Sequence, residues 1–278
     1  MYNFLDIFRL EDPIHVMDIG AAVINEEPAY TELLRKGAAY LTAFDGDERQ
    51  ARAMIEKYGS STTVFSDFLF DGTNQTAFLS RPEAGMSSLL KPREAALKFF
   101  NGFEFFGEVV SELSVPTRRL DDYESINPVD LLKMDVQGCE LTVLQNGQNT
   151  LADCLVMQLE VPFVCLYEQQ PTLGDIDCWM RGQGFIPHSF VDIKRWAISP
   201  TVFDGNFRIP GNQLLEADIT YIKDPMNAED LTPLQLQKMS ILADEYLKSF
   251  DLCVFFLLEL ASRELITKND VEDYLAKR

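Results

Sequence analysis

Apolar runs rich in strand-forming residues alternate with helical patterns from the start of the chain. The first three runs are HVMDIGA, AYLTAFDGD and TTVFSDFLF, and helical patterns over residues 29–36 and 48–58 separate them. Period-two runs that alternate with period-3.6 segments predict a parallel sheet with right-handed crossovers and helices on its faces.

The same alternation returns after a break. LLKMDVQG, a helix over 140–151, CLVMQLEV, a helix over 173–182, GFIPHSFVDI and EADITYIKD follow in order, which brings the predicted strands to seven. In between, residues 71–119 are interrupted by Gly, Asn, Ser and Pro around one helical pattern at 92–100. We expect an excursion here, and a lid or substrate wall would lie in it.

The last part of the chain is polar and helical. Leu231-Thr232-Pro233 supplies a helix start, and two or three helices are expected. The apolar run LCVFFLLEL is interrupted by Glu259 and is too short to span a bilayer, so we interpret it as a buried helix face. The sequence therefore predicts an α/β domain over 1–224 and a helical extension over 225–278, which could be a substrate cap, a dimer interface, or both.

Charge and cysteine content exclude several classes of partner. The 278 residues include 44 acidic and 24 basic side chains, a formal charge of −20, and such a surface repels nucleic acid and anionic membranes. The five cysteines form no C-x-x-C pair, and the first residues lack a signal-peptide pattern. We expect a cytoplasmic protein with reduced cysteines, no membrane span and no structural metal.

Two motifs point to a cofactor. VMDIGAA and LLKMDVQGCELTVLQNG each end an apolar run with an acidic residue, a glycine and a helical pattern. Ligands of open parallel sheets bind at the carboxyl edge, so Asp18-Gly20 and Asp135-Gly138 are candidates for one shared site. A dinucleotide needs G-x-G-x-x-G, but 16–28 holds a single glycine, Gly20. S-adenosylmethionine has no phosphate and is favoured, with Asp18 near its amino-acid end; an ordinary βα turn is the alternative.

Further polar residues follow the other predicted strands. Asp45 ends the second strand and could accept both ribose hydroxyls, while the neighbouring Asp47 could be the ligand or cap the next helix. Asp67 and Phe68 end the third strand, where a hydrogen bond and a stacked ring could meet adenine.

Three residues are candidates for a general base: Asp135, Glu160 and His188. Asp135 could instead orient the cofactor, hold a metal or cap the helix after Gly138. A neutral imidazole is the usual acceptor of a hydroxyl proton, although a lone histidine is more often structural. The two carboxylates could also hold Mg²⁺; we favour a metal-free reaction.

Seven blocks, in this order, resemble the FkbM family of S-adenosylmethionine-dependent methyltransferases: VMDIGAA, AFDGDER, MSSLLKP, VPTRRLDDY, LLKMDVQGCELTVLQNG, MQLEVPFVCLYEQQPTLGDIDCWMRGQGF and LLEADITYIKD. The resemblance covers about residues 14–224 and implies a Rossmann-like class I methyltransferase fold whose last strand is antiparallel. It also implies O-methylation of a hydroxyl on a sugar, glycolipid or polyketide-type product.

The resemblance extends to single positions. By position, the family's motifs match the following residues: Asp18, Gly20 and Ala21 in the first cofactor motif, Asp45 after strand two, Asp135, Gly138 and Glu140 after strand four, and Glu160 and Tyr167 after strand five. Two motifs depart from the family. Ala22-Val23-Ile24 replaces the continuation N-x-G of the first motif, and Phe44-Asp45-Gly46-Asp47 replaces F-E-P-D.

The working hypothesis is an S-adenosylmethionine-dependent O-methyltransferase acting on a small-molecule or glycan hydroxyl, with a possible homodimer through the C-terminal helices. Two alternatives belong to other classes. An eroded first motif and a helical tail would suit a non-catalytic interaction protein that keeps the fold. A NAD-dependent oxidoreductase would share the sheet, but the missing glycines argue against it.

Overall fold

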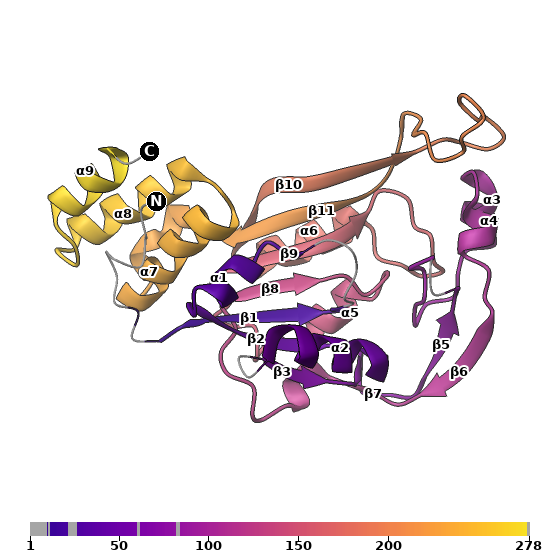
Figure 1. Cartoon of the computed structure of the whole chain (residues 1–278), viewed down its shortest axis with the longest axis horizontal. Coiled ribbons are helices and arrows are strands. Elements are labelled where there is room, and N and C mark those ends of the chain that lie inside the picture. Colours follow the sequence, from indigo (N-terminus) through magenta and orange to yellow (C-terminus); the bar gives the residue numbers. More distant parts are fainter. Residues whose placement is uncertain (1–9, 11, 22–26, 60–61, 82–83, 277–278) are drawn as a thin grey trace.

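One seven-stranded sheet forms the centre of the molecule (Figure 1), a computed structural model that describes residues 10, 12–21, 27–59, 62–81 and 84–276. Its strand order is β10-β11-β9-β8-β1-β2-β3. The strands are β1 (Ile14–Ile19), β2 (Ala39–Phe44), β3 (Thr62–Phe65), β8 (Leu131–Met134), β9 (Val156–Pro162), β10 (Phe185–Trp196) and β11 (Gln213–Lys223). The pairs from β3 to β9 are parallel, and β11 runs antiparallel to both β9 and β10. The predicted α/β fold with an antiparallel last strand is confirmed.

Each face of the sheet carries its own hydrophobic core, because alternate side chains of a strand point to opposite faces. Val16 lies in the first core with α1 (Thr31–Arg35) and α2 (Glu48–Tyr58), and Met17 lies in the second with α5 (Glu140–Gln145) and α6 (Leu173–Gly182). Thr172 and Asp175 form a capping box that starts α6 at the predicted residue. Helices on both faces leave the carboxyl edge of the sheet for ligands.

Two predicted elements end earlier than the pattern indicated. The third strand stops at Phe65, because Phe68–Leu69 forms a separate strand, β4, that pairs with β7 (Thr117–Arg118). The helix predicted over 140–151 stops at Gln145, where the Asn146 side chain donates to the Thr142 carbonyl at 2.9 Å and the chain turns. A side chain that bonds to its own helix end competes with further helix growth.

The excursion lies beyond the carboxyl ends of the parallel strands (Figure 1). Its hairpin of β5 (Gln75–Leu79) and β6 (Ser111–Val115) is antiparallel, and between these strands come the short helices α3 (Glu94–Phe99) and α4 (Phe103–Phe106). Phe100 and Phe103 pack with Trp196 at the end of β10 in a third, small core. The excursion is thus held to the far end of the sheet.

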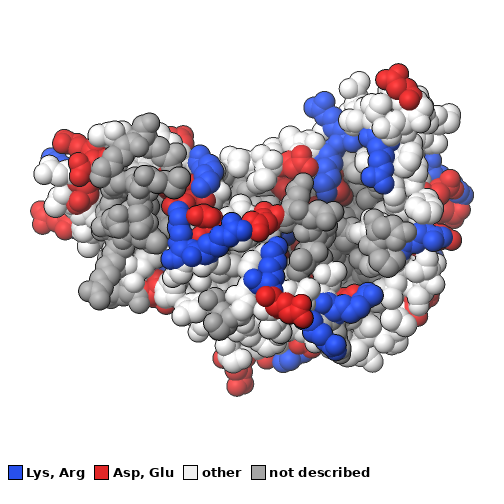
Figure 2. Space-filling view, in the orientation of Figure 1, with Lys and Arg blue, Asp and Glu red and all other residues white. Residues whose placement is uncertain are grey.

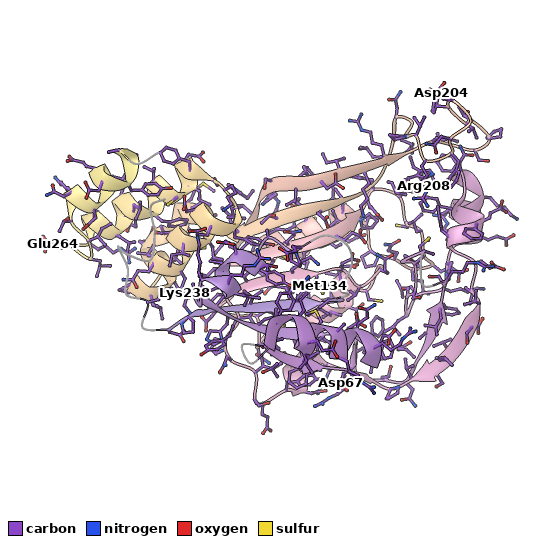
Figure 3. All side chains as sticks on the ribbon, in the orientation of Figure 1. Asp67, Met134, Asp204, Arg208, Lys238 and Glu264 are labelled. Atoms are coloured by element: carbon purple, nitrogen blue, oxygen red, sulfur yellow. The ribbon has the colours of Figure 1, made fainter. Side chains whose placement is uncertain are left out.

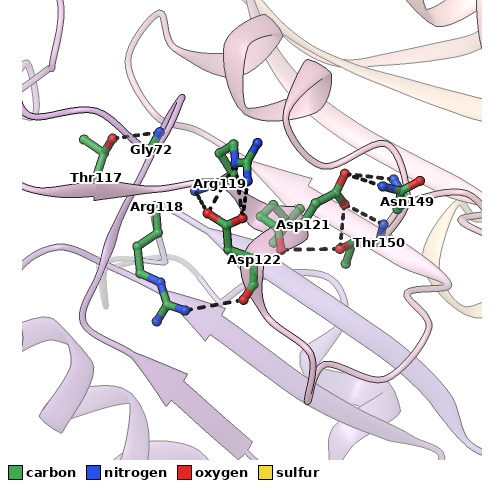
Figure 4. A network of polar contacts seen from close by, with 9 residues as sticks. Gly72, Thr117, Arg118, Arg119, Asp121, Asp122, Asn149 and Thr150 are labelled. Atoms are coloured by element: carbon green, nitrogen blue, oxygen red, sulfur yellow. Dashed lines mark hydrogen bonds and ion pairs between the residues drawn. The ribbon is translucent and has the colours of Figure 1, made fainter.

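A polar network fastens the return of the excursion to the sheet (Figure 4). Asp121, in the 3₁₀ turn η3 (Leu120–Asp122), accepts hydrogen bonds from the backbone N–H groups of Asn149 and Thr150 at 3.2 and 2.8 Å. Asp122 accepts from the Arg119 guanidinium at 2.7 Å. These bonds fix where the chain enters β8, and therefore where Asp135 emerges.

The tail consists of η4 (Pro225–Asp230), α7 (Pro233–Ile241), the π-helical turn η5 (Leu242–Tyr246), α8 (Phe250–Ser262) and α9 (Lys268–Ala276). It lies at the opposite end of the molecule from the excursion (Figure 1). The predicted apolar face of α8 is buried and joins the first core. Lys238 of α7 is buried and donates to Asp12 and Asp130 at 2.7 Å each, which ties the tail to the sheet (Figure 3). The boundary at 224 and the lid over 71–119 remain predictions.

None of the helices over the described residues has the length and apolar character that a bilayer crossing demands.

Candidate active site

A polar strip crosses the carboxyl-end half of the first face of the sheet. Asp18 of β1 is in register with Lys133 of β8, which is in register with Gln158 of β9, and all three alternate with residues of the second core. Asp18 is buried, accepts from the Tyr30 hydroxyl at 2.5 Å and lies 3.5 Å from the Lys133 ammonium. Burial raises the pKa of Asp18, and Lys133 opposes that shift. Burial would lower the pKa of Lys133, but the nearby carboxylates outweigh it and raise that pKa.

The two cofactor-facing motifs meet at Gly20. Its φ is +79°, and a Cβ there would lie 1.8 Å from the backbone oxygen of Asp135. The N–H groups of Gly20 and Ala21 donate to the Phe44 carbonyl at 2.9 and 3.2 Å. Only glycine allows the turn after β1 to pass this close to the turn after β8. The residues Ala22-Val23-Ile24, where the first motif departs from the family, lie outside the described residues.

Asp135 and Glu160 lie side by side, joined by one side chain. The Gln137 amide nitrogen donates to Asp135 Oδ1 at 2.8 Å and to Glu160 Oε2 at 2.9 Å. The other oxygen of Glu160 accepts from Lys194 at 2.9 Å, and Lys194 also donates to Glu216 at 2.8 Å. Burial and the charge of Asp135 raise the pKa of Glu160 well above its usual range. A carboxyl group with a raised pKa can hold a proton and exchange it with a neighbouring group.

Glu140, and not Asp135, braces the turn that opens α5. Its carboxylate accepts from the backbone N–H groups of Val136 at 3.0 Å and Gly138 at 3.2 Å. Burial raises the pKa of Glu140 to about 7. The N-cap position of α5 is Cys139, which makes no side-chain cap bond. The capping alternative for Asp135 is therefore wrong, and its carboxylate is left for the pair with Glu160.

At the end of β2, the turn that follows Asp45 lies against the ring of Phe68. A Cβ on Gly46 would come within 2.4 Å of that ring, so Phe68 packs directly on the turn. Asp45 Oδ1 accepts from the Asp47 N–H at 2.8 Å, and its Oδ2 has no hydrogen-bond partner among the described residues. Burial raises the pKa of Asp45 to about 6. Asp47 caps α2 through the Arg49 N–H, the alternative considered for it above.

One carboxylate oxygen of Asp67 already contacts protein groups. Its Oδ2 accepts from the Tyr123 hydroxyl at 2.7 Å and lies 3.8 Å from Arg118, whose guanidinium stacks on the Tyr123 ring. It lies on the β3 side of the sheet, away from Met134 at the end of β8 (Figure 3). Asp67 Oδ1 is the atom left to meet a ligand.

The structure does not bring His188 to the carboxylate pair. His188 lies at a β-bulge between Pro187 and Ser189, half-buried, and the charged group facing it is Asp251 of α8. Burial lowers the pKa of His188, which keeps the ring neutral near pH 7. The β10 residue that reaches Glu160 is Lys194.

Four residues of this cluster were not assigned to the site from their chemistry in the sequence: Tyr30, Gln137, Tyr167 and Lys194. Gln137 stands inside a recognised motif, and Tyr167 matched the family only by position. Tyr30 and Lys194 carry no sequence signal, since their contacts depend on which elements become neighbours.

The local charge favours a cationic ligand. Five carboxylates gather on this strip and two ammonium groups oppose them: Asp18, Asp135, Glu160, Glu216 and Asp218 against Lys133 and Lys194. A mainly acidic, partly buried strip of side chains attracts sulfonium and ammonium groups. Elsewhere, Lys and Arg lie across the middle of one face and on the β10–β11 arm (Figure 2).

A hollow lies on the other face of the sheet. It has a volume of about 490 Å³ and lies between α6 and the ends of β9, β10 and β11, lined by apolar side chains such as Phe163 and Phe190. It contains none of the carboxylates of the strip, so it is not the site that the polar residues form. The described residues also contain no group of three or more His, Cys, Asp or Glu arranged to hold a metal ion.

The fold and the acidic carboxyl edge agree with one class of protein, the Rossmann-like methyltransferases that use S-adenosylmethionine, and the family match shows that class. Residues 14–187 match the family model described as the methyltransferase FkbM domain. The chain belongs to this family.

One curated relative is the 2-O-methyltransferase NoeI of Sinorhizobium fredii, which is 29% identical over 187 residues, 63% of this chain and 73% of that protein. Among solved structures, the magnesium protoporphyrin IX methyltransferase of Synechocystis with bound SAM has a TM-score of 0.36 and 11% identity, over 76% of this chain and 71% of that chain. An uncharacterized Listeria monocytogenes protein has a TM-score of 0.38 and 11% identity, over 76% and 62%.

Proposed function

We propose that the protein methylates a hydroxyl group of a small molecule, in the class of sugars, glycolipids and polyketide-type products. Membership of the FkbM family and the likeness to a 2-O-methyltransferase support this class. The observation that carries the proposal is the pair of Asp135 and Glu160, held together at the carboxyl edge of the sheet. A hydroxyl acceptor has a proton to lose, and this pair can take it.

For the cofactor, the proposal assigns the ribose hydroxyls to the open Oδ2 of Asp45 and the adenine ring to Phe68, with Asp67 Oδ1 beside it. The turn at Asp18, Gly20 and Ala21 would lie at the amino-acid end. When bound, S-adenosylmethionine supplies a methyl group on a positively charged sulfur. The residues fit that group, because the acidic strip stabilises the cation and the Asp45 oxygen that has no protein partner among the described residues can accept from a diol.

For the reaction, Asp135 or Glu160 would accept the proton of the acceptor hydroxyl, and His188 is too remote from the pair to share that role. Both oxygens of Glu160 already accept from Gln137 and Lys194, which supports a metal-free reaction. Most of the acceleration would come from holding the hydroxyl in line with the methyl group in a cleft without water. The excursion beyond the strand ends is the proposed wall for the acceptor.

The test is methyl transfer from radiolabelled S-adenosylmethionine to a panel of sugars, glycolipids and polyketide alcohols. Release of S-adenosylhomocysteine with any of them excludes the non-catalytic alternative. Calorimetric titration with S-adenosylmethionine and with NAD comes first. Saturable binding of NAD without any response to S-adenosylmethionine would overturn the proposal.

A homodimer through the tail is a separate proposal. Phe255 and Leu258 lie one turn apart on α8 and are 43% and 55% exposed, and paired apolar side chains on a helix often contact a partner helix. Light scattering on the wild type and on Phe255→Glu checks it. A monomeric wild type at high concentration refutes it.

A further inference from the structure

We propose that Gln137 is the positioning residue of the active site: its amide holds Asp135 and Glu160 together, and Tyr167 fixes the direction of that amide. The inference rests on the proposed function only in its consequence for catalysis. The hydrogen bonds of Gln137 and Tyr167 are made to other protein groups, so the positioning itself does not depend on the proposed reaction.

The amide nitrogen of Gln137 donates to a carboxylate on each of two strands. It lies 2.8 Å from Asp135 Oδ1, after β8, and 2.9 Å from Glu160 Oε2, in β9. A primary amide has two N–H groups, so each carboxylate receives one of them. Hydrogen bonds to charged acceptors are the stronger kind. One side chain thus draws two carboxylates together that would otherwise repel each other.

The amide can do this in only one of its two orientations. Gln137 Oε1 accepts from the Tyr167 hydroxyl at 2.9 Å, and the same hydroxyl lies 3.3 Å from the Met86 carbonyl. Tyr167 is buried, and burial raises its pKa, so the hydroxyl keeps its proton and remains a donor. A flipped amide would turn its oxygen toward both carboxylates and its nitrogen toward a hydroxyl. Tyr167 therefore acts on the carboxylates through Gln137.

The backbone of Gln137 is held as firmly as its side chain. Its φ is +51°, in the left-handed region that non-glycine residues seldom adopt. The carbonyl of Gln137 accepts from the Ser88 hydroxyl at 2.7 Å. Strained backbone persists where the surroundings over-determine it, and it is concentrated at functional sites. Since Ser88 and Met86 both belong to the excursion, the proposed acceptor wall contacts Gln137 and Tyr167 directly.

Other charged groups around the pair come from every neighbouring element. They are Lys194 of β10, Glu216 and Asp218 of β11, Lys133 of β8, Asp18 of β1 and Glu140 of α5. Within the described part of the chain, the donors to Glu160 are the Gln137 amide and Lys194. Without the Gln137 donor the two carboxylates lose a shared bond to their charged forms, so their protonation becomes easier and their titration moves to higher pH.

The experiment is a carboxyl ¹³C NMR titration of the full chain without cofactor or acceptor. Gln137→Met, which keeps the length but removes the amide, should move the titration of the pair upward by about one pH unit or more. Tyr167→Phe should move it in the same direction by less, and Gln137→Met/Tyr167→Phe no further than Gln137→Met alone. Exposed matched controls, Gln148→Met and Tyr40→Phe, should leave it unchanged.

Two results overturn the inference: an unchanged titration in Gln137→Met, or an additive effect of Tyr167→Phe in its presence. If Gln137→Met fails to fold, Tyr167→Phe, which removes one oxygen, decides the question. In the transfer assay the pH optimum should move with the titration and kcat should fall more than KM for the cofactor rises. A shifted titration with no transfer by the wild type to any hydroxyl supports the positioning role and refutes the proposed acceptor chemistry.

Discussion

Asp45 offers the sharpest test of the cofactor site, because one of its carboxylate oxygens is free for a ligand and the neighbouring Asp47 supplies a control variant. Its Oδ1 is used within the turn by the Asp47 N–H, while Oδ2 is open. Asp45→Ala removes the open acceptor for the ribose. A lost hydrogen bond to a charged group is worth about 1.5 to 3 kcal/mol, which corresponds to a roughly tenfold to hundredfold weaker Kd.

The assay is isothermal titration calorimetry with S-adenosylhomocysteine, in parallel on Asp47→Ala. Asp47 is the cap of α2, so Asp47→Ala should lower stability but leave the Kd within about threefold. Asp45→Ala should weaken the Kd by the factor given above, beyond any loss of stability from the missing hydrogen bond of the Asp47 N–H. An unchanged Kd in Asp45→Ala, or equal weakening in both variants, refutes the ribose assignment.

The pH dependence follows from the pKa of Asp45, which burial raises to about 6. The ribose hydroxyls donate to the ionised carboxylate, so wild-type affinity should fall as pH drops through 6, and Asp45→Ala should lose that dependence. The folded state binds the proton more tightly than the unfolded chain does. The contribution of Asp45 to folding stability is therefore present at low pH and is lost as the pH rises through about 6, the pKa of its carboxyl in the folded state. Asp45→Asn should accordingly raise Tm at pH 7, measured by scanning calorimetry.

Three further predictions concern the acid pair and the framework. Glu160→Gln should lower kcat of methyl transfer by about a hundredfold or more, whereas His188→Ala should change it less than threefold; the opposite order would exchange their roles. Gly20→Ala should destabilise the fold by several kcal/mol in urea unfolding, because its Cβ would meet backbone at 1.8 Å, while Gly182→Ala, with nothing within 4 Å, should not. Lys238→Met should cost about 3 to 5 kcal/mol in the same assay, since it leaves the buried Asp130 carboxylate without its ammonium partner; an unchanged midpoint would show that the tail docks without it.

The alternation of apolar runs was sufficient to predict the sheet and the buried face of α8, whereas the antiparallel last strand was implied by the resemblance to the FkbM family. Strand identity depends on local periodicity, which can be recognised from the sequence alone. The residues at which strands and helices end were harder to predict from the sequence. The third strand stops at Phe65 and α5 stops at Gln145, because β7 offers a competing partner in one case and the Asn146 side chain bonds to the helix end in the other.

What the sequence by itself determined is which residues stand at the carboxyl edge: Asp18 with Gly20, Asp45, and Asp135. Only the tertiary structure decided what these residues touch. Lys194 reaches Glu160 instead of His188, because the register places Lys194 opposite Glu216, close to Glu160. His188 lies at the level of Thr220 and Tyr221, which pair with the earlier part of β9. Gln137 joins two carboxylates because the strand order makes β8 and β9 neighbours. Register and side-chain direction across a sheet are set by pairing between distant segments, and a single chain pattern does not contain them.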